Sequence, residues 1–233
     1  MKSAEIDENG FGILENVLDA ETVLYLANEL ANLKPSNSVS RTNESVYAVR
    51  NLLNLSPKAR EFSNSETVAN ITKNFFGETA KVVRAIFFDK TPDANWKVPW
   101  HQDLTIAVKE KRETKGFSAW TRKAEIQHVQ PPIEILEKML TLRFHLDDAN
   151  ETNGALKIIP GSHKNGRLSA DEIKSLRQAN ETRICSVKKG DCLIMRPLIL
   201  HSSSAGTSPK NRRVLHFEFS AQELPNGLNW YGS

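Results

Sequence analysis

The chain has 233 residues, of which 39% are hydrophobic and 25% charged, with a formal net charge of +3. This apolar content can bury a core, so the composition excludes a disordered chain, and apolar runs such as Cys192 to Met195 are too short to cross a bilayer. The small net charge, without a dense basic run, argues against nucleic acid as a partner. We expect one domain over residues 1–233, because barrels and sandwiches often reach this length.

The cysteines and the first residues bear on the cellular compartment. Cys185 and Cys192 are the two cysteines, and such sparse use fits a reducing compartment better than a disulfide framework. We interpret both as free core thiols. The first ten residues are acidic and show no secretory signal. The sequence therefore predicts a cytoplasmic protein without a membrane partner.

Helical periodicity marks three segments. The first lies between Asp19, a suitable N-cap, and Pro35. The second begins near Ser65 and ends at Gly77, which suits a C-terminal cap. The third follows a capping-box signature that starts at Ser169. Two of the three helices thus fall within residues 1–80.

Strands are expected mainly after the first two helices. Asn153-Gly154 predicts a hairpin-like reversal, while Gly161 and Gly190-Asp191 mark further turns. We expect residues 1–80 to supply helices that pack on a barrel core formed by residues 81–220. The predicted strands, rich in aliphatic or aromatic residues, are Lys81 to Asp89, Leu140 to Leu146, Ala155 to Ile159, Arg183 to Val187, Cys192 to Met195 and Arg212 to Ser220.

Two of these strands have one apolar and one polar face, because alternate residues of a strand face opposite sides. This pattern allows two interpretations. A sandwich would turn the polar faces to solvent, whereas a barrel would turn them into an enzyme cavity and cover the apolar faces with helices. The polar faces carry Thr141, Arg143 and His145 in one strand and Arg212, His216 and Glu218 in the other.

The motif His101-Gln102-Asp103 is a candidate metal site. Residues two apart on an extended segment project to the same side, with backbones roughly 6.5 to 7 Å apart, so His101 and Asp103 can reach one ion. The spacing alone is frequent by chance. His201 is the best third ligand, because it ends a buried apolar segment and is followed by small residues. Two histidines and a carboxylate leave coordination positions open, as in non-haem Fe(II) oxygenases.

The remaining histidines receive other interpretations. His163 lies in a turn and is interpreted as a structural residue, although it stays the rival to His201 as a metal ligand. His128 is placed in a polar loop bounded by prolines. His145 and His216 are better candidates for positions around the metal or the substrate.

Several segments together resemble the phytanoyl-CoA dioxygenase family of Fe(II)- and 2-oxoglutarate-dependent oxygenases, over nearly the whole chain. The resemblance implies a mainly β fold, a double-stranded β-helix (jelly-roll) barrel with helices packed outside one sheet. The segments are Gly10 to Glu15, His101 to Asp103, Asn153 to Leu156, Pro160 to His163, Gly190-Asp191 and His201 to Ser203.

The resemblance also implies an activity and its cofactors. His101, Asp103 and His201 would bind Fe(II), with 2-oxoglutarate and O2 as co-substrates. The enzyme would convert 2-oxoglutarate to succinate and carbon dioxide while oxidising an unactivated C–H bond of a small organic substrate. Halogenating relatives lack the carboxylate, so Asp103 favours hydroxylation or a related oxidation. The alternatives are a metal-binding jelly roll without activity and, less favoured, a nucleic-acid demethylase.

For the keto acid, the resemblance implies that Arg212 holds the distal carboxylate of 2-oxoglutarate and that Ser203 adds a hydrogen bond. Arg213 is the rival, but it shares its strand face with apolar residues, whereas Arg212 lies on the polar face. Arg143 stands where the family pattern often has an aromatic residue. It is expected to contact either the keto acid or an anionic substrate.

The segment Leu104 to Pro132 is expected to be a long loop that acts as a mobile cover over the open metal positions. Gly116 would be its flexible point, and Trp120 would close an apolar wall against the substrate. Its many lysines and arginines suggest an acidic or acyl-carrier-bound substrate. The alternative is a solvated loop without a role.

Overall fold

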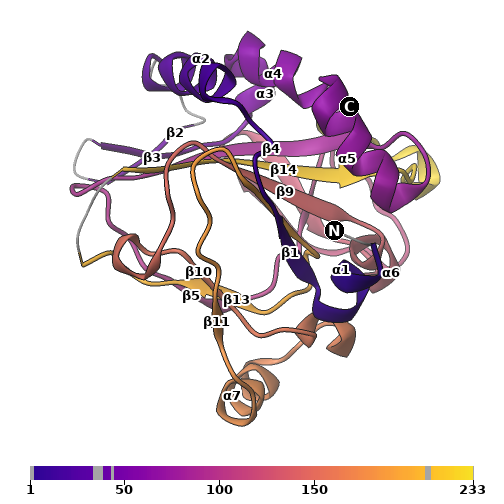
Figure 1. The fold of residues 1–233 in the computed structure, drawn as a ribbon. Helices are drawn as coiled ribbons and strands as arrows, with labels where there is room; N and C mark the ends of the chain where they lie inside the picture. Colours follow the sequence, from indigo (N-terminus) through magenta and orange to yellow (C-terminus); the bar gives the residue numbers. More distant parts are fainter. Residues whose placement is uncertain (1–2, 34–38, 43–44, 208–210, 233) are drawn as a thin grey trace.

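Three antiparallel sheets form the frame of the computed structural model, which describes residues 3–33, 39–42, 45–207 and 211–232 (Figure 1). The large sheet comprises, in spatial order, β1 (Phe11–Leu14), β12 (Cys192–Met195), β9 (Leu140–His145), β14 (Arg212–Ser220), β4 (Lys81–Lys90), β3 (Ser45–Val49) and β2 (Val39–Thr42). The small sheet comprises β11 (Arg183–Ile184), β10 (Leu156–Ile158), β13 (His201–Ser203) and β5 (Val98–His101). The third sheet comprises β6 (Ile106–Val108), β8 (Ile126–Gln130) and β7 (Ser118–Lys123).

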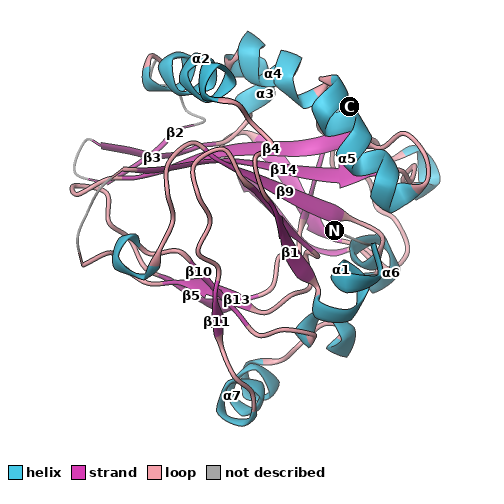
Figure 2. Cartoon of the chain, in the orientation of Figure 1, coloured by secondary structure: helices cyan, strands magenta, loops and turns pink. Residues whose placement is uncertain are grey.

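Figure 2 shows α2 to α5 together on the outer side of the large sheet, while α7 lies beyond the small sheet. No α-helix in the described part of the chain is long and apolar enough to span a membrane. The α-helices are α1 (Ser3–Asn9), α2 (Ala20–Ala31), α3 (Leu52–Leu55), α4 (Pro57–Ser63), α5 (Glu66–Phe76), α6 (Ile133–Glu137) and α7 (Ala170–Ala179). Among the described residues, short 3-10 helices cover Glu151–Asn153, Ser162–Asn165 and Pro225–Gly227.

The main core lies between the large sheet and the helices α2 to α5. Phe144 of β9 and Phe217 of β14 are fully buried there against Phe62 of α4, whose ring centroid is 4.8 Å from that of Phe144. Burying a side chain of this size stabilises the fold by roughly 1.5–3 kcal/mol. The apolar faces of β9 and β14 are thus covered by helices. Their polar faces point into the barrel and are also buried, so the barrel interpretation is confirmed and the solvent-facing sandwich is wrong.

The three helices expected from periodicity are present with their predicted caps. The side chain of Asp19 accepts a hydrogen bond from the backbone of Thr22 at the start of α2. Ser65 caps α5, and Gly77 ends it in the left-handed region. Ser169 forms a capping box at the start of α7. Cys185 and Cys192 are free and buried, as predicted.

Three sequence expectations need correction. The turn at Asn153-Gly154 is not a hairpin, because it joins β9 to β10, which belong to different sheets. The strand expected over Arg183 to Val187 ends at Ile184, and Val187 makes only an isolated bridge. Residues 1–80 are not solely helical, since β1, β2 and β3 join the large sheet.

The expectation of a long loop over Leu104 to Pro132 is also wrong. The segment carries β6, β7 and β8, and Val108 bridges to Trp230 near the end of the chain. Val129 and Trp230 are buried in one hydrophobic cluster, and Trp120 packs against that cluster instead of lining the cavity of the candidate metal site. This part of the chain is therefore an integral layer of the fold.

Candidate metal centre and co-substrate cavity

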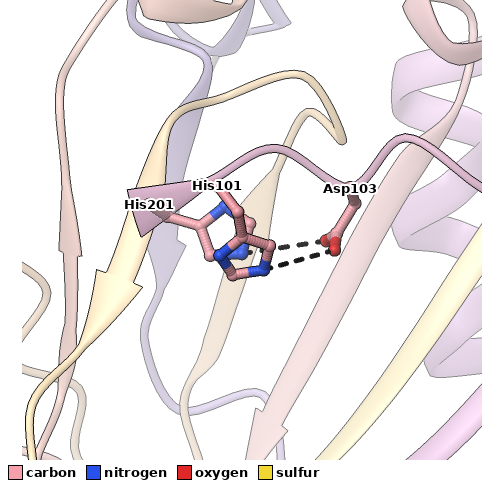
Figure 3. Close-up of side chains that lie close together, drawn as sticks. All are labelled: His101, Asp103 and His201. Atoms are coloured by element: carbon pink, nitrogen blue, oxygen red, sulfur yellow. Dashed lines mark ion pairs between the residues drawn. The ribbon is translucent and has the colours of Figure 1, made fainter. Parts of the chain in front are cut away.

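The pairing of β5 with β13 brings the candidate metal ligands together. The register places His201 directly opposite His101, although one hundred residues separate them. Asp103 follows β5 by two residues, so its side chain projects to the same side as that of His101. Figure 3 shows the two imidazole rings and the carboxylate facing one another. The structure thus brings together the three residues that the sequence predicted as metal ligands.

The distances suit three donors that share one ion. The Nε2 atoms of His101 and His201 each lie 3.8 Å from an oxygen of Asp103. One ligand atom from each residue lies within 4.8 Å of the others. A separation of 3.8 Å is too long for a hydrogen bond. Two donors that each sit about 2.1 Å from one ion are at most about 4.2 Å apart, so a metal fits between them after a small closure.

The protonation states also fit a metal. The Nδ1 atoms of His101 and His201 lie 2.9 Å from the carbonyl oxygens of Pro99 and Ile199, so each Nδ1 carries the proton and each Nε2 offers a lone pair. Burial lowers the pKa of His201 to about 4, so the ring is neutral at pH 7. Burial opposes ionisation of Asp103, but electrostatic interaction with the neighbouring histidines, His201 first, outweighs it and lowers the pKa to about 2.

Gln102, between the two ligands, anchors the motif to the surrounding chain. Its amide donates hydrogen bonds of 2.7 Å to the carbonyl oxygens of Gly166 and Leu198. Its amide oxygen accepts a bond of 2.8 Å from the backbone of Leu168. The side chain is buried and fully engaged, which fixes the backbone that carries His101 and Asp103.

The ligand cluster opens into a cavity of about 250 Å³, called here the triad cavity. The polar faces of β9 and β14 form much of its wall, as the barrel interpretation predicted. Its polar lining outside the ligand cluster includes Arg143, Ser203, Arg212, His216 and Glu218.

Arg212 and Arg213 have different surroundings. Arg212 is 3% exposed, and its Nε and Nη1 atoms have no hydrogen-bond partner among the described residues. Burial, with the charge of Arg143, lowers the pKa of Arg212 to about 9. Arg213 instead makes two hydrogen bonds of 2.8 Å to the carboxylate of Asp147. Arg212, and not Arg213, is therefore available to a ligand in the triad cavity.

Lys90 is a buried residue that the sequence analysis missed, and it bonds to Ser203 in the wall of the triad cavity. It lies directly opposite Arg212 in the pairing of β4 with β14. Its ammonium donates hydrogen bonds of 3.1 Å to Oγ of Ser203 and of 2.7 Å to the carbonyl of Ser204. Burial, and then the charge of Arg212, lowers the pKa of Lys90 to about 7. Two buried cations thus face each other beside Ser203.

Gly154 makes room for this arrangement. Its φ of +77° lies in the left-handed region, and a Cβ atom there would come within 2.4 Å of the carbonyl oxygen of Ser204 and 2.7 Å of the Lys90 nitrogen. The hydroxyl of Ser203 donates a hydrogen bond of 2.8 Å to the carbonyl of Gly154. A side chain at this corner would displace Lys90 from Ser203.

A hydrogen-bonded chain fixes Arg143. Its Nη1 donates to Nδ1 of His216 at 2.7 Å, and Nε2 of His216 donates to Glu218 at 3.1 Å. Glu218 also accepts a bond from Arg84 at 3.1 Å. The guanidinium of Arg143 lies 5.5 Å from the centre of the Phe88 ring. These hydrogen bonds hold Arg143 as a rigid cation in the wall of the triad cavity.

The other histidines occupy three different environments. His163 packs against Gly10, with its Nε2 3.1 Å from the carbonyl of Asp7, so it contacts the N-terminal region and not the ligand cluster. His128 lies buried in β8, so its placement in a loop was wrong. Both ring nitrogens of His145 lack a partner among the described residues, and burial holds its pKa well below the ordinary value.

The chain is similar in sequence to one family of dioxygenases. The family described as "Phytanoyl-CoA dioxygenase (PhyH)" matches residues 6–214. Phytanoyl-CoA dioxygenase 1 of Oryza sativa subsp. japonica is 26% identical over 186 residues, which cover 76% of this chain and 56% of that protein. Ectoine dioxygenase of Bordetella bronchiseptica is 25% identical over 253 residues, covering 96% and 75%. The chain thus spans little more than half the length of the Oryza relative.

Solved structures share the fold. AviO1 from Streptomyces viridochromogenes Tue57 superimposes with a TM-score of 0.71 at 21% identity, covering 96% of this chain and 95% of that one. EctD from S. alaskensis gives a TM-score of 0.74 at 16% identity, covering 94% and 74%. These matches confirm the predicted double-stranded β-helix fold.

Proposed function

The chain belongs to the phytanoyl-CoA dioxygenase family, and we propose that it is an Fe(II)- and 2-oxoglutarate-dependent dioxygenase that oxidises an unactivated C–H bond of a small organic substrate. One observation carries the proposal. A cluster of two histidines and a carboxylate lies in the same cavity as Arg212, a buried cation whose Nε and Nη1 have no partner among the described residues. A metal site and an anion site beside each other suit a keto acid that chelates the metal at one end.

In this proposal His101 and His201 bind Fe(II) through their Nε2 lone pairs and Asp103 binds it through a carboxylate oxygen. The three donors occupy one side of the ion and leave positions for the keto acid and oxygen. EctD, which shares the fold, has been solved with bound Fe and with 2-oxoglutarate. That precedent supports the proposed pair of cofactors.

Arg212 is proposed to hold the distal carboxylate of 2-oxoglutarate through its guanidinium, which can form two parallel hydrogen bonds. Ser203 and Lys90 stand beside it, and Lys90 supplies a second positive charge. Arg143, on the neighbouring strand β9 of the same sheet, is proposed to contact the keto acid or the substrate. A bound dianion would relieve the repulsion among these buried cations, and a dicarboxylate such as 2-oxoglutarate carries the charge that is needed.

Iron and 2-oxoglutarate together supply oxygen activation, coupled to loss of carbon dioxide from the keto acid. Overall, one oxygen atom enters the C–H bond as a hydroxyl and the other enters succinate, so O2 is consumed without an external reductant. The role of the protein is to orient the target carbon towards the metal and to keep the cavity closed to water. The buried walls formed by β9, β13 and β14 are suited to that role.

The test is anaerobic reconstitution with Fe(II) and 2-oxoglutarate, followed by air and a screen of metabolite pools for succinate release. We expect release that depends on a pool component and that His201→Ala abolishes together with iron binding. His163→Ala is the matched control and should retain both. Iron and 2-oxoglutarate binding without substrate-dependent succinate would favour a non-catalytic binding protein. Loss of iron in His163→Ala, with His201→Ala unaffected, would contradict the ligand assignment.

A further inference from the structure

A second cavity of about 360 Å³ adjoins the triad cavity. Arg50, Arg84 and Ile86 line both cavities, so the two spaces meet at these side chains. The far wall of the second cavity is formed by β6, β8 and the C-terminal residues around Tyr231. The segment that the sequence suggested as a loop is thus a fixed wall of this space.

The size of the triad cavity requires such an extension. Cavities that bind small molecules usually measure about 300–1,000 Å³. The triad cavity has about 250 Å³ and, in the proposed function, must also contain 2-oxoglutarate. A substrate whose reacting carbon lies near the metal therefore has to continue beyond this cavity.

The described charged residues that line the second cavity are all positive. Four cations line it, namely Arg50, Arg60, Arg84 and Lys109, and no carboxylate belongs to its described lining. Arg84 is paired with Glu218 at the border of the two cavities. Arg60 is held in a fixed orientation by hydrogen bonds of 2.9 Å to the carbonyl of Leu53 and 2.7 Å to the side chain of Asn54. An oriented cation of this kind suits a carboxylate or phosphate oxygen.

The cavity also offers apolar contact. Leu52, Leu53 and Ile126 contribute side chains to its wall. His128, in the same wall, is neutral at pH 7, because burial and then the charge of Arg84 lower its pKa to about 4. The lining therefore combines a hydrocarbon surface with cations, which fits an amphipathic anion better than a sugar or a neutral amide.

A third hollow, lined by Lys97, Lys157 and Arg177, also borders the small sheet. It lies on the other face of that sheet, because Lys157 pairs with Ser202, and alternate residues turn His201 and Ser203 inward. Lys157 therefore points away from the triad cavity, although Val98 and Ser203 contribute to the lining of both spaces. The third hollow serves as a control surface and not as an extension of the site.

We propose that the substrate spans the two cavities, with the carbon to be oxidised in the triad cavity and an oxyanion, a carboxylate or phosphate ester, held by Arg60 and Lys109 in the second. This inference rests on the proposed function and specifies the substrate class as an amphipathic organic acid. The apolar body of that acid would pass Ile86 at the border between the cavities.

The experiment measures binding of matched probes by titration calorimetry, using protein saturated with Mn(II) and 2-oxoglutarate so that no turnover occurs. Hexanoate and hexyl phosphate carry the two oxyanions, and hexan-1-ol is their neutral counterpart. We expect at least one anion to bind about tenfold more tightly than the alcohol, because hydrogen bonds to a charged group are stronger than those to a neutral group. The stronger of the two identifies the oxyanion preferred by the cavity.

Four variants locate the effect. Lys109→Glu should weaken binding of the preferred anion about fivefold while leaving affinity for 2-oxoglutarate unchanged. Lys111→Glu changes the same charge two residues away, on a side chain that pairs with Glu113 outside the cavity, and should bind the anion normally. Lys157→Glu, in the hollow behind the sheet, should also bind it normally. Arg60→Gln, with folding verified by circular dichroism, should weaken binding at least as much as Lys109→Glu.

Equal affinity for hexan-1-ol and both anions would overturn the proposal. So would an equal loss in Lys109→Glu and Lys111→Glu, which would reveal only a long-range charge effect. Displacement of the anions by additional 2-oxoglutarate would place them in the co-substrate site. In each case 2-oxoglutarate binding and succinate release can persist, so failure of this inference remains distinct from failure of the proposed function.

Discussion

Lys90 and Arg212 face each other across β4 and β14, and this pair of like charges is central to the site. Like charges directly opposite on neighbouring strands destabilise a sheet. Both side chains are nevertheless buried, at 2% and 3% exposure. An anion bound beside the two cations would offset their repulsion. At the scale of residues, this pair therefore supports the proposed binding of a dicarboxylate.

The guanidinium geometry of Arg212 gives the first prediction. Arg212→Lys keeps the charge but loses the planar fork, so the affinity for 2-oxoglutarate should fall at least about tenfold while iron binding persists. Arg213→Lys is the matched control, because Arg213 is bound to Asp147 on the other face of β14. Calorimetric titration of 2-oxoglutarate into the Mn(II) protein measures both variants. The assignment fails if Arg213→Lys shows the defect and Arg212→Lys does not.

The pKa of Lys90 gives the second prediction. Burial and Arg212 lower this pKa to about 7 from its ordinary value of 10.5, so Lys90 loses its charge as the pH rises above 7. A bound dianion favours the charged form, and binding at pH 8 should therefore take up a proton. The affinity for 2-oxoglutarate should decrease from pH 7 to pH 9. In the absence of ligand, the unfolded chain binds more protons in that window, so the stability contributed by this group rises with pH.

Calorimetry in two buffers of different ionisation enthalpy measures the proton uptake. Lys90→Met should bind 2-oxoglutarate more weakly at pH 7 and should take up less than half of the wild-type proton at pH 8. An unchanged uptake in Lys90→Met would show that another group titrates and would remove Lys90 from the proposed carboxylate site.

At the scale of elements, the sequence predicted the long two-faced strands well, because β9 and β14 alternate cleanly between apolar and polar residues. It missed β5, whose Pro99 argues against a strand; the proline is tolerated because β5 lies at the edge of the small sheet. It missed Lys90 because the predicted strand stopped at Asp89. Continued alternation from Arg84 would have placed Lys90 on the strand face that lines the triad cavity with Ile86 and Phe88.

The segment Leu104 to Pro132 was misjudged because its exposed strand β7 is rich in charged residues and β6 is only 3 residues long. Long-range contacts that no local pattern shows hold it in place. The backbone of Lys109 donates to Asn229, and that of Tyr231 donates to Ala107. The pairing of β5 with β13, which places His101 opposite His201, also joins residues that are far apart in the sequence. The motifs therefore predicted the ligands but not the register of the two strands.

The third prediction distinguishes a wall from a cover. Replacing residues 110–116, the exposed connection before β7, by a short glycine-serine linker should leave the melting temperature almost unchanged. Replacing Val129 by Asp places a charge in the buried cluster that includes Trp230 and should destabilise the protein by about 3 kcal/mol or more. Thermal unfolding measures both variants. A Val129→Asp protein of wild-type stability would show that this sheet does not belong to the core. It would favour the interpretation of Leu104 to Pro132 as a mobile cover.

At the scale of the whole molecule, the buried cations of the triad cavity couple stability to ligand binding. A protein that carries uncompensated charge at its functional site sacrifices stability for binding. Replacing one such charge by an apolar side chain of similar length is often stabilising by 1 kcal/mol or more. Arg212→Met should therefore raise the melting temperature of the ligand-free protein by about 2–4 °C, the shift expected for 1 kcal/mol in a chain of this size.

The same variant should lose the stabilisation that the ligand provides. For the wild type with Mn(II), 2-oxoglutarate at one hundred times its Kd should add about 2.7 kcal/mol, or about 5–10 °C in melting temperature. Pyruvate shares the chelating keto acid but lacks the distal carboxylate, so at equal concentration it should add much less. In Arg212→Met the two ligands should become equivalent, and differential scanning fluorimetry compares all four combinations. A ligand-free Arg212→Met protein that melts below the wild type would contradict the idea of uncompensated charge. A shift by 2-oxoglutarate that survives the substitution would place the distal carboxylate elsewhere in the barrel.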